Sequence, residues 1–131
     1  MLQKLLVPES VNGFPLEGYK PIFLGVWCGS TPYARDLSSL GQVCAPYGLS
    51  EQQREIDFQE ARKLDGALFK ALVRALNKVH GLDKSERYWR VIIGHFCYRI
   101  SDIVINRVNT MRAAIRESNP DLVLVTEQAS K

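Results

Sequence analysis

The stretch PIFLGVWC, Pro21 to Cys28, decides the fold class. Its apolar residues run almost without interruption up to Gly29, whereas a strand with one solvated face alternates apolar and polar residues. A continuous apolar run of this kind is typical of a strand that is covered on both faces, as in a parallel sheet. We therefore predict a buried strand here, in a parallel sheet with chain packed on each side.

A long helix is predicted downstream of this strand. Ser50 and Gln53 form a capping-box pattern, in which the serine hydroxyl accepts a backbone N–H and the glutamine side chain reaches back to the cap. Apolar residues at helical spacing then continue to Val79, and Gly81 is suited to end the helix in a left-handed conformation. The pattern therefore predicts one amphipathic helix between Ser50 and Gly81.

A second helix is predicted from a similar pattern. Asp83 and Glu86 repeat the capping box, and apolar residues at helical spacing continue from Trp89 onward. Asn119-Pro120 ends the helix, because proline cannot continue the hydrogen-bond ladder. A helix of this length measures about 50 Å at 1.5 Å per residue, so we expect a kink near Gly94.

Two further strands complete the predicted sheet. QVCAPYG, residues 42–48, indicates a brief strand, and DLVLVTE, residues 121–127, a final buried strand. Long helices between buried strands imply crossover connections and parallel pairing. We predict an α/β fold with a small parallel sheet of about three strands and two long helices, formed by residues 21–131 as a single domain. Residues 1–20, rich in proline and glycine, are expected to be a loose lead-in.

Length and composition exclude several classes of protein. A chain of 131 residues with 46% hydrophobic and 24% charged residues is typical of one soluble globular domain. The net charge of +3 is too small to indicate nucleic-acid binding. Charged side chains interrupt the most apolar run, so we expect no transmembrane segment. Three cysteines without close spacing favour reduced thiols, and therefore a cytoplasmic protein.

The first candidate site follows the predicted strand. Ligands of open α/β sheets bind beyond the carboxyl ends of the strands, which would bring Trp27 and Cys28 to a ligand. The loop after them supplies further candidates, Ser30, Thr31 and Tyr33. The alternative is that Trp27 and Cys28 are ordinary core residues, and nothing nearby in the sequence would lower the pKa of the Cys28 thiol. Neither a P-loop nor a GxGxxG pattern is present.

The second candidate site is the stretch KSERYWRVIIGHFCYRISD, residues 84–102, which crowds aromatic and basic side chains into one helix. His95 follows Gly94, whose missing side chain would let a backbone or a ligand approach, and an imidazole suits a general base or a phosphate partner. Arg99 and Asp102 are spaced to pair on one helix face. The alternative is an ordinary helix, with its aromatic residues in the core and its basic residues in solvent. The candidates for substrate contacts in this stretch are Tyr88, Arg90, His95 and Arg99, with His95 also the candidate catalytic residue.

Other site chemistries lack a pattern in this sequence. No Cys-x-x-Cys or His-x-x-x-His pair supplies two metal ligands at close spacing, so we expect no metal and no bound cofactor. No GxSxG elbow indicates a serine triad.

Several phrases of the sequence, in their order and separation, resemble one transferase family. They are FLGVWC (Phe23 to Cys28), the Asn-x-x-His-Gly segment Asn77 to Gly81, the phrase Tyr88 to Arg90, and Ile93-Gly94. Over residues 20–118 the chain is similar to the amino-terminal region of transferases found in bacterial O-antigen and other surface-polysaccharide clusters. It departs from that family at Val26, where an acidic residue is expected, and at His95-Phe96, where the family has Pro-Trp.

The resemblance implies a function that the residues alone do not. It implies part of a glycosyltransferase-like enzyme that moves a glycosyl or related group from an activated sugar donor to a carbohydrate or lipid-linked acceptor. The chain would be the first lobe of a two-lobed enzyme, incomplete without its carboxyl-terminal lobe and peripheral at the inner face of the membrane. Trp27, Cys28, Tyr88, Arg90 and His95 would line the cleft, with aromatic faces on the sugar and Arg90 or His95 on phosphate or hydroxyl groups.

Two other functions remain open at this point. The long second helix could present an unfinished apolar face to another chain, as in a non-catalytic interaction module. A small stand-alone enzyme that uses Cys28 as its nucleophile is the other reading, and it requires a reactive thiol.

Overall fold

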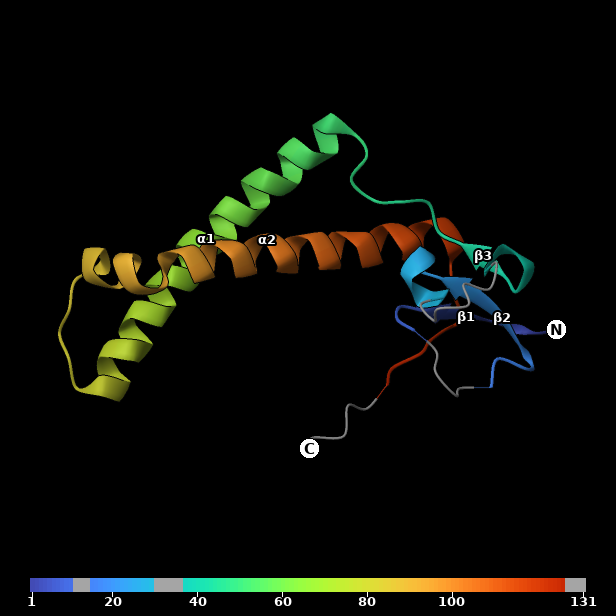
Figure 1. Ribbon diagram of the computed structural model, residues 1–131, viewed down its shortest axis with the longest axis horizontal. Helices are drawn as coiled ribbons and strands as arrows, with labels where there is room; N and C mark the ends of the chain where they lie inside the picture. Colours follow the sequence, from blue (N-terminus) through green and yellow to red (C-terminus); the bar gives the residue numbers. More distant parts are fainter. Residues whose placement is uncertain (11–14, 30–36, 127–131) are drawn as a thin grey trace. The chain divides into compact units, whose positions relative to one another are not determined.

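The computed structural model describes residues 1–10, 15–29 and 37–126 (Figure 1). Ser30, Thr31 and Tyr33, named above as candidate ligand contacts, lie outside the described residues. The chain forms two compact units, one made of residues 1–47 and 110–131 and the other of residues 48–109. We call them the sheet unit and the helical unit and describe each by itself.

In the described part of the chain, the sheet unit is built on four parallel strands in the order β3-β2-β1-β4. The strands are β1 (Gln3–Val7), β2 (Tyr19–Phe23), β3 (Gln42–Val43) and β4 (Leu122–Val123). The predicted α/β fold with a small parallel sheet and two long helices is confirmed. The sheet has one more strand than expected, because β1 forms within the first 20 residues, which we expected to be a loose lead-in.

Both faces of the sheet are covered, as the continuous apolar run of the second strand predicts. Leu5, Val7 and Phe23 belong to a core cluster on one face, which also holds Cys28. Leu6 and Ile22 belong to the cluster on the other face, where the end of the second helix contributes Ala114. Alternate residues in the buried parts of β1 and β2 therefore enter opposite cores, so neither strand has a polar face in these parts.

The predicted strand at PIFLGVWC ends earlier than its apolar run suggests. β2 stops at Phe23, and Val26–Gly29 forms a short 3₁₀ helix. Gly25 lies at the turn between them, and a Cβ atom there would come within 2.0 Å of the Trp27 ring. Any side chain at residue 25 would therefore force the Trp27 indole to move from its place over the backbone.

The final strand is an edge strand and is not buried as expected. Leu122 and Val123 of β4 are exposed, and only the following Leu124 enters the core. Among the described residues β4 pairs with β1 alone. An edge position explains how an apolar run can leave half of its side chains in solvent.

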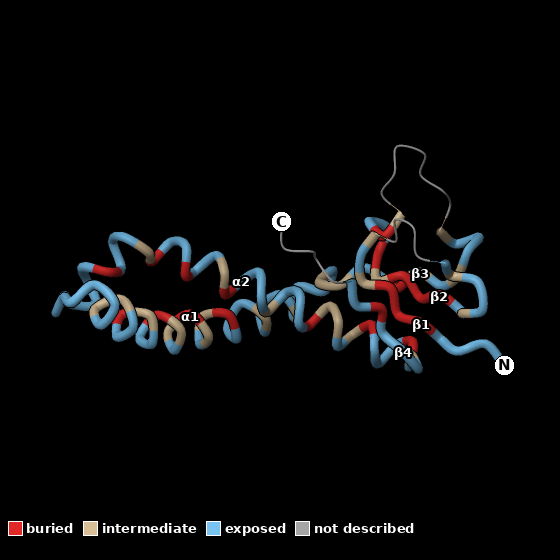
Figure 2. Tube along the Cα trace, turned by 90° about the horizontal axis from the view of Figure 1, so that it is seen from below, coloured by how far each residue is buried: buried red, intermediate tan, exposed pale blue. Residues whose placement is uncertain are grey.

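The helical unit is a hairpin of two long helices, α1 (Glu51–His80) and α2 (Glu86–Ser118), of which α2 continues beyond the unit. Phe69 and Val73 of α1 pack against Trp89 and Cys97 of α2. Figure 2 shows the buried positions of the two helices on facing sides. The antiparallel packing continues to Asp57, whose carboxylate accepts a hydrogen bond from the Asn109 amide at 2.9 Å.

The helix ends follow the predicted chemistry with two corrections. Ser50 caps α1 as expected, but the Gln53 side chain donates to Asp57 instead of reaching back. Gly81 ends α1 with φ of 63°, as predicted. The cap of α2 is Ser85, whose hydroxyl accepts the Tyr88 N–H at 3.2 Å, and not Asp83.

The second helix is continuous through Gly94, where we expected a kink. It ends at Ser118, as the following Asn119-Pro120 predicts. Asn119 adopts a positive φ of 45°, and its N–H closes the last turn on the Ile115 carbonyl at 2.9 Å. This left-handed residue satisfies a terminal carbonyl in the way that a C-terminal glycine does.

Candidate functional site

The carboxyl edge of the sheet positions the first two candidate residues. The Trp27 indole N–H donates to the Pro8 carbonyl at 3.2 Å, and the Cys28 thiol donates to the Val7 carbonyl at 3.3 Å. Both acceptors lie at the carboxyl end of β1, so the 3₁₀ helix that follows β2 is tied to the neighbouring strand. Trp27 is half exposed and offers an aromatic face there, while Cys28 is buried.

The chemistry of Cys28 does not suit a nucleophile. Burial raises the pKa of its thiol above the ordinary value of 9.0, and the nearby Glu9 carboxylate raises it further. The hydrogen bonds from the backbone at Gly25 and Leu24 lower the pKa by less than burial raises it. The thiol is therefore protonated near neutral pH, whereas a nucleophilic cysteine needs a depressed pKa and access to substrate.

The same edge contains two polar residues that the sequence analysis did not single out. Glu9 follows β1, Thr126 follows β4, and the threonine hydroxyl donates to the Glu9 carboxylate. They bridge the carboxyl ends of two adjacent parallel strands. Because β1 was not predicted from the sequence, Glu9 could not be recognised as a residue that follows a strand. Their signal in the sequence is a polar residue directly after an apolar run, in LLVPES and LVLVTE.

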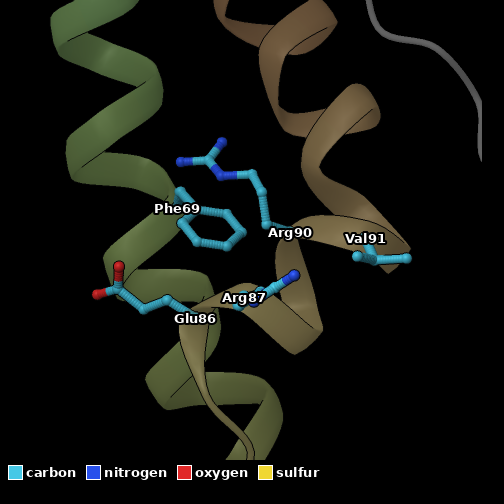
Figure 3. A pocket seen from close by; sticks show the side chains of 5 residues that line it. All are labelled: Phe69, Glu86, Arg87, Arg90 and Val91. Carbon is cyan, nitrogen blue, oxygen red and sulfur yellow. The ribbon is translucent and has the colours of Figure 1, made fainter.

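The helical unit contains a pocket beside the first turns of α2. Its volume is about 400 Å³, and it is open to solvent. Figure 3 shows the side chains that line it, which are Phe69, Glu86, Arg87, Arg90 and Val91. Of the six candidate residues only Arg90 lies in this pocket, and it comes with a second arginine and a carboxylate that were not predicted.

Arg90 is held from two sides. Its guanidinium nitrogen lies 3.2 Å from the Asp65 carboxylate, and its guanidinium carbon lies 3.6 Å from the centre of the Phe69 ring. Gly94 makes this possible, because a Cβ atom there would come within 2.7 Å of the Arg90 side chain. The missing side chain therefore admits a neighbouring side chain, where we expected a backbone or a ligand. The ion pair and the cation–π contact link α2 to α1.

Tyr88, His95 and Arg99 lie on a different side of α2. At 100° per residue, each is about 140° or more around the helix from Arg90. His95 and Arg99 are exposed, and Tyr88, 41% exposed, contacts the Trp89 ring edge-on at 5.1 Å. The predicted pair of Arg99 and Asp102 is wrong, because Asp102 pairs with Arg62 of α1. α2 therefore does not bring His95 and Arg90 to one place.

Asn77 organises the corner between the helices and was not predicted as a functional residue. Its side-chain oxygen accepts the Lys84 N–H at 3.0 Å and the Trp89 indole N–H at 2.9 Å. Its amide donates to the Lys84 carbonyl at 2.9 Å, and its backbone carbonyl accepts the Leu82 N–H. His80 stacks on Trp89 at 6.2 Å between ring centres. The sequence segments Asn77 to Gly81 and Tyr88 to Arg90, which carry the family resemblance, therefore form the two sides of the corner between α1 and α2.

The candidate residues fall into separate units. Trp27 and Cys28 belong to the sheet unit, and Tyr88, Arg90, His95 and Arg99 belong to the helical unit. A common substrate site for all six stays a prediction. Within the described part of the chain, no group of three or more His, Cys, Asp or Glu residues could hold a metal ion. No helix among the described residues is long and apolar enough to cross a membrane.

The parallel pairing of the described strands, together with the two long helices between β3 and β4, defines a protein of the α/β class. Residues 5–131 match the family model described as LIC12162 family transferase, and the chain belongs to this family. The resemblance to a transferase family is thus confirmed, and the match extends beyond residues 20–118 to include β1 and β4. No curated protein and no solved structure matches the chain.

Proposed function

We propose that the chain forms the first lobe of a glycosyltransferase-like enzyme in the assembly of bacterial surface polysaccharide, such as the O-antigen of lipopolysaccharide. Membership of a transferase family supports the reaction class. The acceptor is then a growing glycan, free or lipid-linked, and the enzyme works on the cytoplasmic side of the membrane. The activated sugar donor binds mainly to a carboxyl-terminal lobe.

The strand order is the observation that supports this proposal best. The order β3-β2-β1-β4 is that of the first four strands of a doubly wound sheet with order 3-2-1-4-5-6. In such sheets the ligand binds beyond the carboxyl ends of the strands at the point where the order reverses, which is between the first and fourth strands. Glu9 and Thr126 occupy that position.

The residues at this edge suit contacts with a sugar. The Glu9 carboxylate can accept hydrogen bonds from sugar hydroxyls, and the half-exposed indole of Trp27 offers a flat apolar face for the ring of a sugar. Cys28, buried and protonated, positions the 3₁₀ helix instead of reacting. In the helical unit, Arg87 and Arg90 could meet phosphate, and His95 remains the candidate general base.

The proposal can be tested by tryptophan fluorescence, because the chain has two tryptophans in contrasting places. Trp27 is half exposed at the proposed site, and Trp89 is 6% exposed in the hairpin core. We expect soluble oligosaccharides from bacterial surface polysaccharides to change the emission of the wild-type chain and to leave that of Trp27→Phe unchanged. Glu9→Gln should weaken the binding by about tenfold, the loss of one charged hydrogen bond.

Glu17→Gln is the matched control, since Glu17 is an exposed carboxylate of the same unit outside the proposed site. Equal weakening by both substitutions would contradict a site at Glu9. If neither oligosaccharides nor nucleoside-diphosphate sugars bind to a folded chain or to a longer reading frame that contains it, the transferase proposal fails.

A second candidate function is a non-catalytic interaction module. The observation in its favour is the row of exposed apolar residues on α2, Ile92, Phe96 and Ile103. A folded chain that binds a macromolecular surface through this row but no sugar would favour this function over the first.

A further inference from the structure

One face of α2 combines exposed apolar and basic side chains. Its apolar members are Tyr88, Ile92, Phe96 and Ile103, and its basic members are His95, Arg99 and Arg107. Phe96 is 63% exposed and Ile92 is 56% exposed, and they lie next to each other at helical spacing as part of an apolar patch. We call this set of seven residues the outer face of α2.

The outer face is one continuous row directed away from α1. Tyr88, Ile92, His95, Arg99 and Ile103 are spaced by four, three, four and four residues, which keeps them on one side of a helix. Cys97 and Ser101, buried in the helical unit, lie on the opposite side of α2. From Tyr88 to Arg107 the row extends for about 29 Å at 1.5 Å per residue.

The charge on this row has a single sign. Between residues 86 and 109 the acidic residues of α2 are Glu86, which lines the pocket, and Asp102, which pairs with Arg62. Glu86 lies on another side of the helix, and Asp102 lies at the margin of the outer face, three residues from Arg99, with its charge paired. Among the described residues, Arg99 and Arg107 have no ion pair. The row therefore offers two unpaired cations among apolar side chains, and the carboxylate at its margin is already paired.

We propose that the outer face of α2 binds the surface of an anionic lipid bilayer. A helix with this pattern lies in the interface, with its apolar side chains at the boundary of headgroups and acyl chains and its arginines on lipid phosphates. A single convex row suits a flat surface, which needs no complementary groove. A second copy of the chain is a poorer partner, because pairing two such rows would bring arginines together without an unpaired carboxylate. The inference deepens the proposed function. It rests on that function only in assuming that the acceptor is lipid-linked and therefore lies at a membrane.

The test is co-sedimentation of the purified chain with vesicles. We expect binding to phosphatidylglycerol–phosphatidylethanolamine vesicles, weaker binding at high salt, and little binding to phosphatidylcholine. Replacing Arg99 and Arg107 by Gln should weaken binding by about fivefold for each arginine, and Phe96→Ala should weaken it by about tenfold. Arg74→Gln and Ile56→Ala on exposed positions of α1 are the matched controls and should bind like the wild type. Circular dichroism checks that each variant is folded.

Three results would overturn the inference. One is binding to anionic vesicles no stronger than to phosphatidylcholine, and another is equal weakening by the α1 controls. The third is an absence of vesicle binding together with binding to a different partner. A dimer that Phe96→Ala dissociates would then assign the outer face to a second copy, and binding to poly-glutamate would assign it to an acidic protein. Vesicle binding is measured without sugar, so a chain that binds oligosaccharide but no vesicle contradicts this inference alone.

Discussion

Each of the three cysteines is buried and free, which agrees with the reduced thiols that their spacing indicates. Burial raises the pKa of all three thiols; near Cys44 the Glu117 carboxylate adds to the effect, and at Cys97 the hydrogen bond with Asp65 does so. At the scale of the single residue, the thiols therefore behave as small apolar groups of the core. This weighs against a stand-alone enzyme with Cys28 as its nucleophile.

Slow alkylation of the native chain is the expected consequence. At neutral pH iodoacetamide should modify Cys28, Cys44 and Cys97 at least about a hundredfold more slowly than in urea, since they are protonated and inaccessible. The free energy of unfolding should be insensitive to these thiols below pH 9.0, the ordinary thiol value, and should decrease above it because the unfolded thiols ionise first. Mass spectrometry of the alkylated peptides gives the rates. Rapid, selective modification of Cys28 would restore the nucleophile reading.

At the scale of the element, the sequence was sufficient for both long helices and for most of their ends. The helical spacing of the apolar residues and the helix-end residues Ser50, Gly81 and Asn119 depend on neighbouring residues alone. Such local signals can be read from a single sequence. The corner between the helices depends on side chains that meet across 7 to 12 residues, so Asn77 carried no local signal. The predicted partner of Asp102 was wrong for the same reason. Its partner in the structure, Arg62, belongs to the other helix.

Asn77 should contribute strongly to the stability of the hairpin. Asn77→Ala leaves the Trp89 indole N–H and both backbone groups of Lys84 without their partner, which should cost about 2 kcal/mol of unfolding free energy. Asn77→Asp keeps the acceptor but loses the donor, so its cost should be smaller. Urea unfolding followed by circular dichroism measures both. The control is Gln59→Ala, which removes an exposed side-chain bond within α1 and should stay within about 0.5 kcal/mol of the wild type. A loss for Asn77→Ala no larger than this control would show that the corner forms without Asn77.

At the scale of the whole molecule, the sequence predicted the fold class but not the centre of the sheet. β1 follows no recognisable helix, and its run LQKLLV is short and ends at Pro8, so the sequence pattern alone does not distinguish it from a loose lead-in. Its strand character depends on pairing with β2 and β4, which are distant in the sequence. Without β1, neither the reversal of strand order nor the position of Glu9 and Thr126 beside it could be predicted. Of the candidate site, Trp27 and Cys28 could be placed after a strand end from the sequence. Which side of α2 faces α1, and so which of its candidates are buried or exposed, requires the hairpin.

The two compact units should respond separately to substitutions in their cores. Leu6→Ala removes a fully buried side chain from the sheet unit, and Phe69→Ala removes one from the helical unit. Each should cost about 3 kcal/mol in its own unit. In native-state hydrogen exchange, Leu6→Ala should accelerate the amides of β1 and β2 about a hundredfold and leave those in the middle of α1 unchanged, while Phe69→Ala should do the reverse. If either substitution accelerates both sets equally, the two units unfold as one cooperative body, and sites in the sheet and the hairpin could not be altered independently.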